Sequence, residues 1–85
     1  MTQTAYIDIC EINRFQTSIM EFVSEWVHKQ RTPVPQKEVI IAMEKLTGRK
    51  YYTTVNALNS LLKKGYIRKT FTISNTVHYV QLRTI

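Results

Sequence analysis

The chain has 85 residues and a formal net charge of +6, and 44% of its residues are hydrophobic. This length and composition indicate one small folded domain over residues 1–85 and exclude a disordered polar tract. The longest apolar run, residues 39–43, is too short to span a membrane, and the first residues lack the pattern of a signal peptide. The one cysteine, Cys10, excludes an internal disulfide framework, so we expect a cytoplasmic protein in which Cys10 is a packing residue.

Charge is distributed unevenly along the chain. Residues 1–44 contain all six acidic residues and four Lys or Arg, whereas residues 45–85 contain eight Lys or Arg and no acid. Mixed charge is enough to keep a small domain soluble, so solubility does not explain a basic half without carboxylates. The distribution predicts a positive field over one face and a polyanionic partner; a solvated basic face without a partner is the alternative.

The first part of the chain is expected to be a loose lead-in over residues 1–7 followed by a long helix over residues 9–31. Asp8 and Glu11 have the spacing of a capping box at the start of this helix. Apolar residues then recur every three or four positions and form one wide stripe. Because several of them also fit heptad positions, the stripe is either core or, in part, a dimer seam formed by Ile12, Ile19, Val23 and Trp26.

A second helix is predicted over residues 36–46, after a break at residues 32–35 that contains two prolines. Pro35 suits the first position of this helix, and Gly48 is placed to end it in the left-handed conformation. The residues expected to face inward are Val39, Met43 and Leu46.

A third helix is predicted over residues 50–64, with Gly65 as its stop. At 100° per residue, the side expected to face inward comprises Thr54, Val55, Leu58, Leu61 and Leu62. The opposite side is polar, small and basic: Arg49, Thr53, Asn56, Ser60 and Lys63, flanked by Tyr52, Ala57, Asn59 and Lys64.

The chain then changes to a β-hairpin pattern. Residues 66–73 and 77–83 are rich in β-branched and aromatic residues, and the short turn between them contains Asn75, which tolerates a positive φ. The hairpin residues expected to be core are Ile67, Phe71, Val80 and Leu82, and the place of Tyr79 is left open.

Three stretches carry a resemblance to a known family: VPQKEVIIAMEKLTGRK, YYTTVNALNSLLKKGYI and HYVQL. The most telling is LLKKGYI, residues 61–67, where leucine and charged residues end a helix before a glycine and an apolar pair. In this order the stretches resemble the winged helix-turn-helix DNA-binding domains over residues 10–83. The resemblance implies an α+β fold in which a three-helix bundle with a helix-turn-helix is followed by a two-stranded wing. It also implies that residues 50–64 enter the major groove and that the wing, residues 66–83, lies on the DNA backbone.

Residue types at the start of the third helix favour DNA binding independently of the resemblance. Helix N-terminal residues reach base edges in the major groove, where Arg suits guanine and Asn suits adenine. The ammonium group of Lys and the hydroxyl groups of Tyr and Thr can donate hydrogen bonds to phosphate oxygens. The candidate contacts on this helix are Arg49, Lys50, Tyr51, Tyr52, Thr53, Asn56, Ser60 and Lys63.

Some of these residues have a second interpretation. One of the two adjacent tyrosines is expected to pack in the core, with Tyr52 nearer the exposed side, and Asn56 is either a base reader or merely solvated. The hairpin tip, residues 74–76, has no Arg or Lys, which favours phosphate contacts by the strands over insertion into the minor groove. The candidate contacts on the hairpin are Arg68, Lys69, Asn75 and His78.

Catalytic and metal-binding patterns are absent from the sequence. His28 and His78 lie far apart with no Cys/His cluster, and two glycines are too few for a phosphate-cradling loop. We therefore expect no enzyme activity, metal, cofactor or small-molecule ligand.

The sequence thus predicts a small homodimeric transcriptional regulator that binds double-stranded DNA, of the kind typical of phage, plasmid or archaeal repertoires. The alternatives are a partition or replication-initiation protein and a protein-interaction winged helix that assembles through its first helix. RNA binding is a further alternative, because the adjacent tyrosines could stack on bases.

Overall fold

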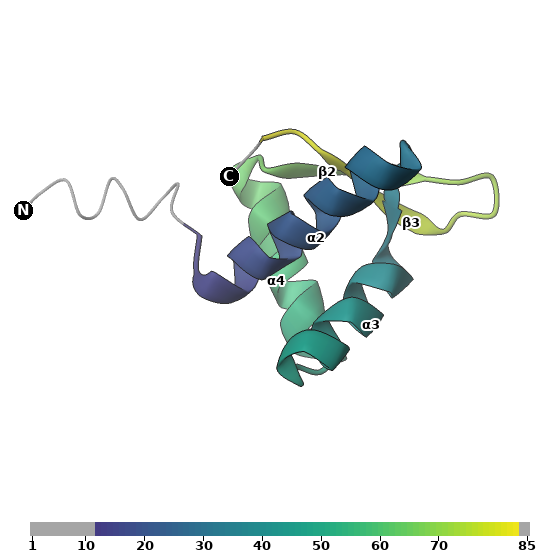
Figure 1. The fold of residues 1–85 in the computed structure, drawn as a ribbon. Helices are drawn as coiled ribbons and strands as arrows, with labels where there is room; N and C mark the ends of the chain where they lie inside the picture. Colours follow the sequence, from purple (N-terminus) through teal and green to yellow (C-terminus); the bar gives the residue numbers. More distant parts are fainter. Residues whose placement is uncertain (1–11, 84–85) are drawn as a thin grey trace, which may run out of the picture.

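A computed structural model describes residues 12–83 of the chain. These residues form a small α+β unit of three helices and a three-stranded antiparallel sheet with the strand order β1-β3-β2 (Figure 1). The elements in chain order are α2 (Arg14–Gln30), β1 (Val34–Pro35), α3 (Gln36–Thr47), α4 (Tyr51–Lys64), β2 (Ile67–Phe71) and β3 (Val77–Gln81). Figure 1 shows the β2–β3 connection projecting beyond the helices.

Helix α2 begins later than the sequence predicts. Asn13 is the N-cap in an extended conformation, its side-chain oxygen accepts a bond from the Gln16 backbone N–H, and the Gln16 side chain accepts one from the Asn13 N–H, at 2.8 and 3.0 Å. This reciprocal capping box fixes the start of the helix at residue 14, so the prediction that the helix includes residues 12 and 13 is wrong. The capping box predicted at Asp8 and Glu11, the lead-in and Cys10 lie outside the described residues.

The apolar stripe of α2 contributes to the core of the single chain. Ile19 and Val23 are fully buried within the single chain, together with Met20. Ile12 and Trp26 are partly buried and pack against the same core. Because Ile19 and Val23 have no exposed surface, the prediction that these two residues contact a second chain is wrong. Ile12 and Trp26 keep part of their surface exposed, and for them the predicted contact stays a prediction.

Strand β1 was not predicted, because it is only two residues long and one of them is a proline, which leaves no recognisable strand pattern. Val34 pairs with Tyr79 and Pro35 pairs with His78, which joins the start of α3 to the sheet. Pro35 is the N-cap of α3 and not its first helical residue, one position earlier than predicted.

Helix α3 ends as predicted, but its last turn is more exposed than the sequence predicts. Gly48 has a φ of 76°, and its N–H donates to the Glu44 carbonyl, which confirms the left-handed cap. Val39 and Met43 are buried as predicted, whereas Leu46 is 67% exposed and the prediction that it faces inward is wrong.

Helix α4 lies against the other helices through Thr54, Leu58 and Leu61, as predicted. Gly65 has a φ of 81°, and bonds from the Gly65 and Tyr66 N–H groups to the Leu62 and Leu61 carbonyls close the helix, which confirms the predicted stop. Ala57 is buried although the sequence placed it beside the outer face, and Val55 is only partly buried.

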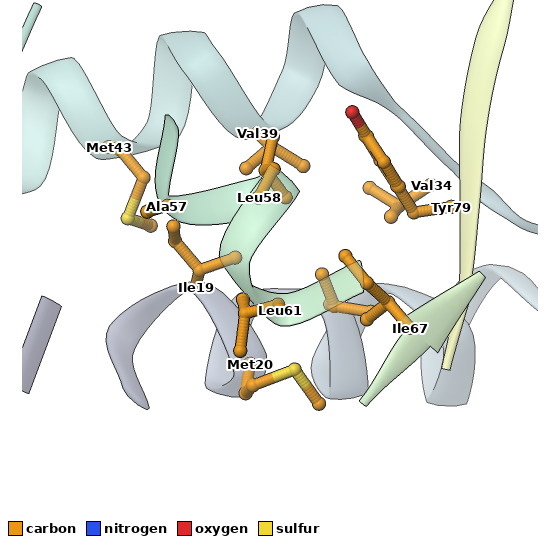
Figure 2. Packing of buried hydrophobic residues seen from close by; sticks show 11 residues of the cluster. Ile19, Met20, Val34, Val39, Met43, Ala57, Leu58, Leu61, Ile67 and Tyr79 are labelled. Carbon is orange, nitrogen blue, oxygen red and sulfur yellow. The ribbon is translucent and has the colours of Figure 1, made fainter. Parts of the chain in front are cut away.

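The core is formed by residues from every helix and strand (Figure 2). Its hydrophobic members are Ile19, Met20, Val23, Val34, Val39, Met43, Ala57, Leu58, Leu61, Ile67 and Tyr79. Of the four hairpin residues predicted as core, only Ile67 is in it. Phe71, at the end of β2 next to the turn, is 56% exposed, Leu82, just after β3, is 53% exposed, and Val80 is only partly buried and lies outside the core cluster.

Tyr79, whose position the sequence left open, lies in the core. Its ring is fully buried, and its hydroxyl oxygen accepts a hydrogen bond from Gln36 Nε2 at 2.8 Å. The loss of solvation on burial raises the pKa of the Tyr79 phenol; the Gln36 bond lowers it, and the charge of Tyr51 adds to the increase. The bond ties the middle of β3 to the first residue of α3.

Candidate nucleic-acid interface

One side of α4 is exposed along its whole length. Tyr52, Asn56, Asn59 and Lys63 recur every three or four residues, are all exposed, and form what we call the α4 outer face. Thr53 and Ser60, which the sequence placed at the centre of this side, are at its margin and only partly exposed. The α4 outer face therefore offers two amides, one phenol and one ammonium group to a partner.

Asn59 is the functional candidate that sequence reasoning undervalued. The outward face of α4 predicted from the sequence differs from the observed one by a rotation of about one residue. The prediction placed Ala57 beside the outward face, whereas Ala57 is only 8% exposed. Small residues such as alanine occur on either side of a helix, so the sequence carried little signal for this rotation.

Both tyrosines at the start of α4 are exposed. Tyr51 is 53% and Tyr52 is 77% exposed, and their rings meet edge to face with centroids 5.4 Å apart. The expectation that one of them packs in the core is wrong, because the first fully buried residue of α4 is Thr54. Tyr52 is the more exposed of the two, as predicted.

The side chain of Arg49 turns toward the start of α2. Its guanidinium stacks over the Phe15 ring of α2, 5.4 Å from the ring centre, and its backbone N–H donates to Thr47 Oγ1. A groove between the start of α2 and the side of α4 brings Arg49 together with Asn56. A planar donor fork held on an aromatic ring next to an amide is an arrangement suited to base edges or phosphate.

The N-terminal end of α4 lacks a side-chain cap. Lys50 is the N-cap residue in an extended conformation and makes no side-chain capping bond, and the first turn contains no acid. Backbone N–H groups at a helix start are orphan donors with a partial positive charge, which favours an anionic group there. Lys50 adds an exposed ammonium group at the same end.

The hairpin candidates lie in two separate places. Arg68 and Lys69 are exposed on β2, shortly after Gly65 ends α4, and as neighbours in a strand they point to opposite faces of the sheet. Asn75 is at the turn with a φ of 67°, which confirms the predicted positive φ. His78 is partly buried, and its Nδ1 lies 3.1 Å from the Thr76 carbonyl oxygen.

Acidic groups are kept to one part of the described chain. In residues 12–83 the carboxylates belong to α2 and α3, as Glu21, Glu25, Glu38 and Glu44. The ion pair found among these residues joins Glu25 to Lys29 at 3.3 Å, within α2. No carboxylate of the described residues therefore lies within 4 Å of the exposed cations of α4 and β2, Lys50, Lys63, Arg68 and Lys69.

The described residues offer neither a cluster of metal ligands nor a helix that could span a membrane. Residues 12–83 contain no group of three His, Cys, Asp or Glu side chains that could hold a metal ion. None of the helices within the described range combines the length and apolarity that crossing a membrane requires. Comparisons of the chain with protein-family models, curated proteins and solved structures found no match.

Proposed function

We propose that the chain is a winged-helix protein that binds double-stranded DNA with α4 in the major groove. The element order and the β1-β3-β2 sheet are compatible with this fold, in which β2 and β3 are the wing. The observation that carries the proposal is the α4 outer face, a solvent-facing helix side of amides, phenol and ammonium in a half-chain without carboxylates. An α-helix fits the major groove, and phosphates on both walls of that groove would repel an acidic helix.

Sequence would be read chiefly by the two amides. Asn56 and Asn59 are exposed three residues apart, and an asparagine amide can bond adenine N6 and N7 together. Arg49, held on Phe15 beside Asn56, is the candidate for guanine. These contacts require side chains to reach base edges, and the small margin residues Thr53 and Ser60 leave room for that approach.

Phosphate contacts would fix the orientation of α4 in the groove. The uncapped N–H groups and Lys50 stand at the start of the helix, and Lys63 stands in its last turn, so the two ends can engage phosphates on opposite walls. Since Arg68 and Lys69 point to opposite faces of β2, only one of them faces the same backbone as Lys63. We propose that whichever of the two faces this backbone adds a phosphate contact and that the activity is that of a small transcriptional regulator.

Fluorescence anisotropy of labelled duplexes over a range of salt concentrations tests the proposal. Target sequences are first selected from a random duplex pool. Lys63→Ala is expected to weaken binding to all sequences alike and to reduce the salt slope by about one. Asn56→Ala and Asn59→Ala are expected to lose about 1–3 kcal/mol on selected sequences and to keep the salt slope.

Lys29→Ala is the matched control, because Lys29 is an exposed lysine on α2 that pairs with Glu25. It is expected to leave both affinity and salt slope nearly unchanged. A wild-type chain that binds no duplex at low salt would end the proposal.

A further inference from the structure

An open groove between α2 and α3 has an apolar floor and an acidic rim. Phe22 of α2 and Ala42 and Met43 of α3 form the floor, the exposed Leu46 of α3 lies at the mouth, and Glu21 and Glu25 line the α2 side. We call this hollow the α2–α3 groove. Its volume of about 320 Å³ is ample for a branched aliphatic or aromatic side chain, since a cavity of about 150 Å³ holds benzene.

Leu46 leaves apolar surface exposed beside this groove. It is 67% exposed on the last turn of α3, although it directly adjoins the buried Met43. An exposed leucine at the mouth of an apolar hollow provides surface that a partner side chain can cover.

The tip of the β2–β3 hairpin presents a matching apolar group. Ile73 is fully exposed and Phe71 is 56% exposed, and Ile73 therefore does not touch the groove of its own chain. Hydroxyl contacts hold the turn: Thr72 Oγ1 lies 2.9 Å from Ser74 Oγ and accepts a bond from the Thr76 N–H at 3.1 Å. Because the turn is already ordered, docking it costs little conformational entropy.

Charge distinguishes the α2–α3 groove from the other apolar hollow. The tip belongs to the half-chain without carboxylates, and Lys69 lies on the same strand face as Phe71. The groove offers Glu21 and Glu25, of which Glu25 also pairs with Lys29. The second hollow, lined by Val27, Thr32, Pro33 and Val80, carries the cation of Arg31, which repels a basic hairpin.

We propose that the hairpin tip of one copy, with Ile73 and Phe71, docks in the α2–α3 groove of a second copy. The contact joins two unlike surfaces, so each copy retains a tip and a groove for further contacts unless the pair closes on itself. The proposal does not depend on DNA binding. Where copies sit side by side on DNA, the same contact makes their binding cooperative, because the second copy is held at a high local concentration.

Sedimentation velocity without DNA tests the contact. The wild-type chain is expected to self-associate as its concentration rises. Ile73→Ser and Leu46→Gln are each expected to weaken association roughly tenfold or more, the factor expected when one buried aliphatic side chain is removed. Leu82→Gln is the matched control, since Leu82 is 53% exposed and lies outside the groove, and it is expected to associate like the wild type.

Disulfide trapping identifies the two surfaces directly. In a Cys10→Ser chain, Ile73→Cys and Leu46→Cys variants are mixed and oxidised, and the mixed dimer is expected to exceed the mixed dimer of Ile73→Cys with Leu82→Cys. Both positions are exposed, so the variants keep the core intact. The proposal is overturned by a wild-type chain that stays monomeric, by association that neither variant weakens, or by equal trapping in both mixtures.

Discussion

The two halves of the described chain share one core but have different surfaces. Helices α2 and α3 carry every carboxylate of residues 12–83, whereas α4 and the hairpin carry none. Ion pairing does not explain this segregation, because the pair between Glu25 and Lys29 is exposed on both sides and contributes little to stability. The core, in contrast, is shared by both halves: Met43 of one half and Leu58 of the other belong to the same buried hydrophobic cluster. The core therefore does not require the segregation of charge, and we propose that the carboxylate-free surface serves to bind a polyanion.

Removing a core residue is expected to have the largest effect, because it disrupts both halves together. Leu61→Ala is expected to lower the free energy of unfolding by about 2–5 kcal/mol, since Leu61 is fully buried between the helices. Urea denaturation followed by circular dichroism measures this change. Leu46→Ala, at an exposed leucine, is the control and is expected to change stability by less than about 1 kcal/mol.

Placing a carboxylate on the basic half tests the difference in surface directly. Asn59→Glu is expected to reduce duplex DNA affinity about tenfold or more at low salt, through repulsion of phosphates, with little change in stability. Anisotropy titration gives the affinity. Gln30→Glu makes the same change of charge on exposed α2, and an equal loss of affinity there would show that net charge, and not the α4 outer face, governs binding.

Tyr79 links the halves through its bond to Gln36 and gives the core a pH dependence. Its pKa is raised by burial in the folded chain, so the folded state holds the phenolic proton more tightly than the unfolded state. The resulting stability is fully present below the unfolded pKa of about 10 and is lost as pH rises through the folded pKa. Thermal melts from about pH 7 to about pH 11 are expected to fall more steeply for the wild type than for Tyr79→Phe. Parallel curves would contradict this role.

Removing the Thr54 hydroxyl is expected to have the smallest effect, and it should stabilise the folded chain instead of destabilising it. Its hydroxyl is buried and has no hydrogen-bond partner in the structure. Thr54→Val keeps the branched shape and removes the unsatisfied group, so we expect a gain in stability of up to about 1 kcal/mol. Thr53→Val, at the partly exposed neighbour, is expected to give no gain in the same urea experiment.

The C-terminal ends of α3 and α4 were the part of the fold that the sequence predicted best. Gly48 and Gly65 both adopt the left-handed conformation expected of them, because this conformation is strained for residues with a β-carbon. Strand β1 escaped prediction because its pairing depends on Tyr79, which is more than forty residues away along the chain. The start of α2 was misplaced because both Glu11 and Gln16 occupy the third position after a capping residue, and local spacing alone does not choose between them.

The polar and basic character of α4 was predictable, whereas its exact rotation was not. Lys63 and Asn56 are exposed as expected, but Thr53 and Ser60 are displaced to the margin by the burial of Ala57. Hydrophobic periodicity fixes a helix face only to within about one residue, because residues at the boundary pack according to their neighbours in space. Leu46 was wrongly placed in the core for a different reason: it shares the helix face of the buried Val39 and Met43 but lies on the last turn of α3, where 67% of its surface is exposed.

The central claim is that DNA binds the α4 side of the molecule. Its most direct test is a titration of the isotope-labelled chain with a short duplex at low salt, following each backbone amide by NMR. We expect the largest shifts across residues 49–64 and at Arg68 and Lys69, with the exposed side of α2 around Glu25 nearly unchanged. Shifts centred on α2 and α3, or none at all, would contradict it.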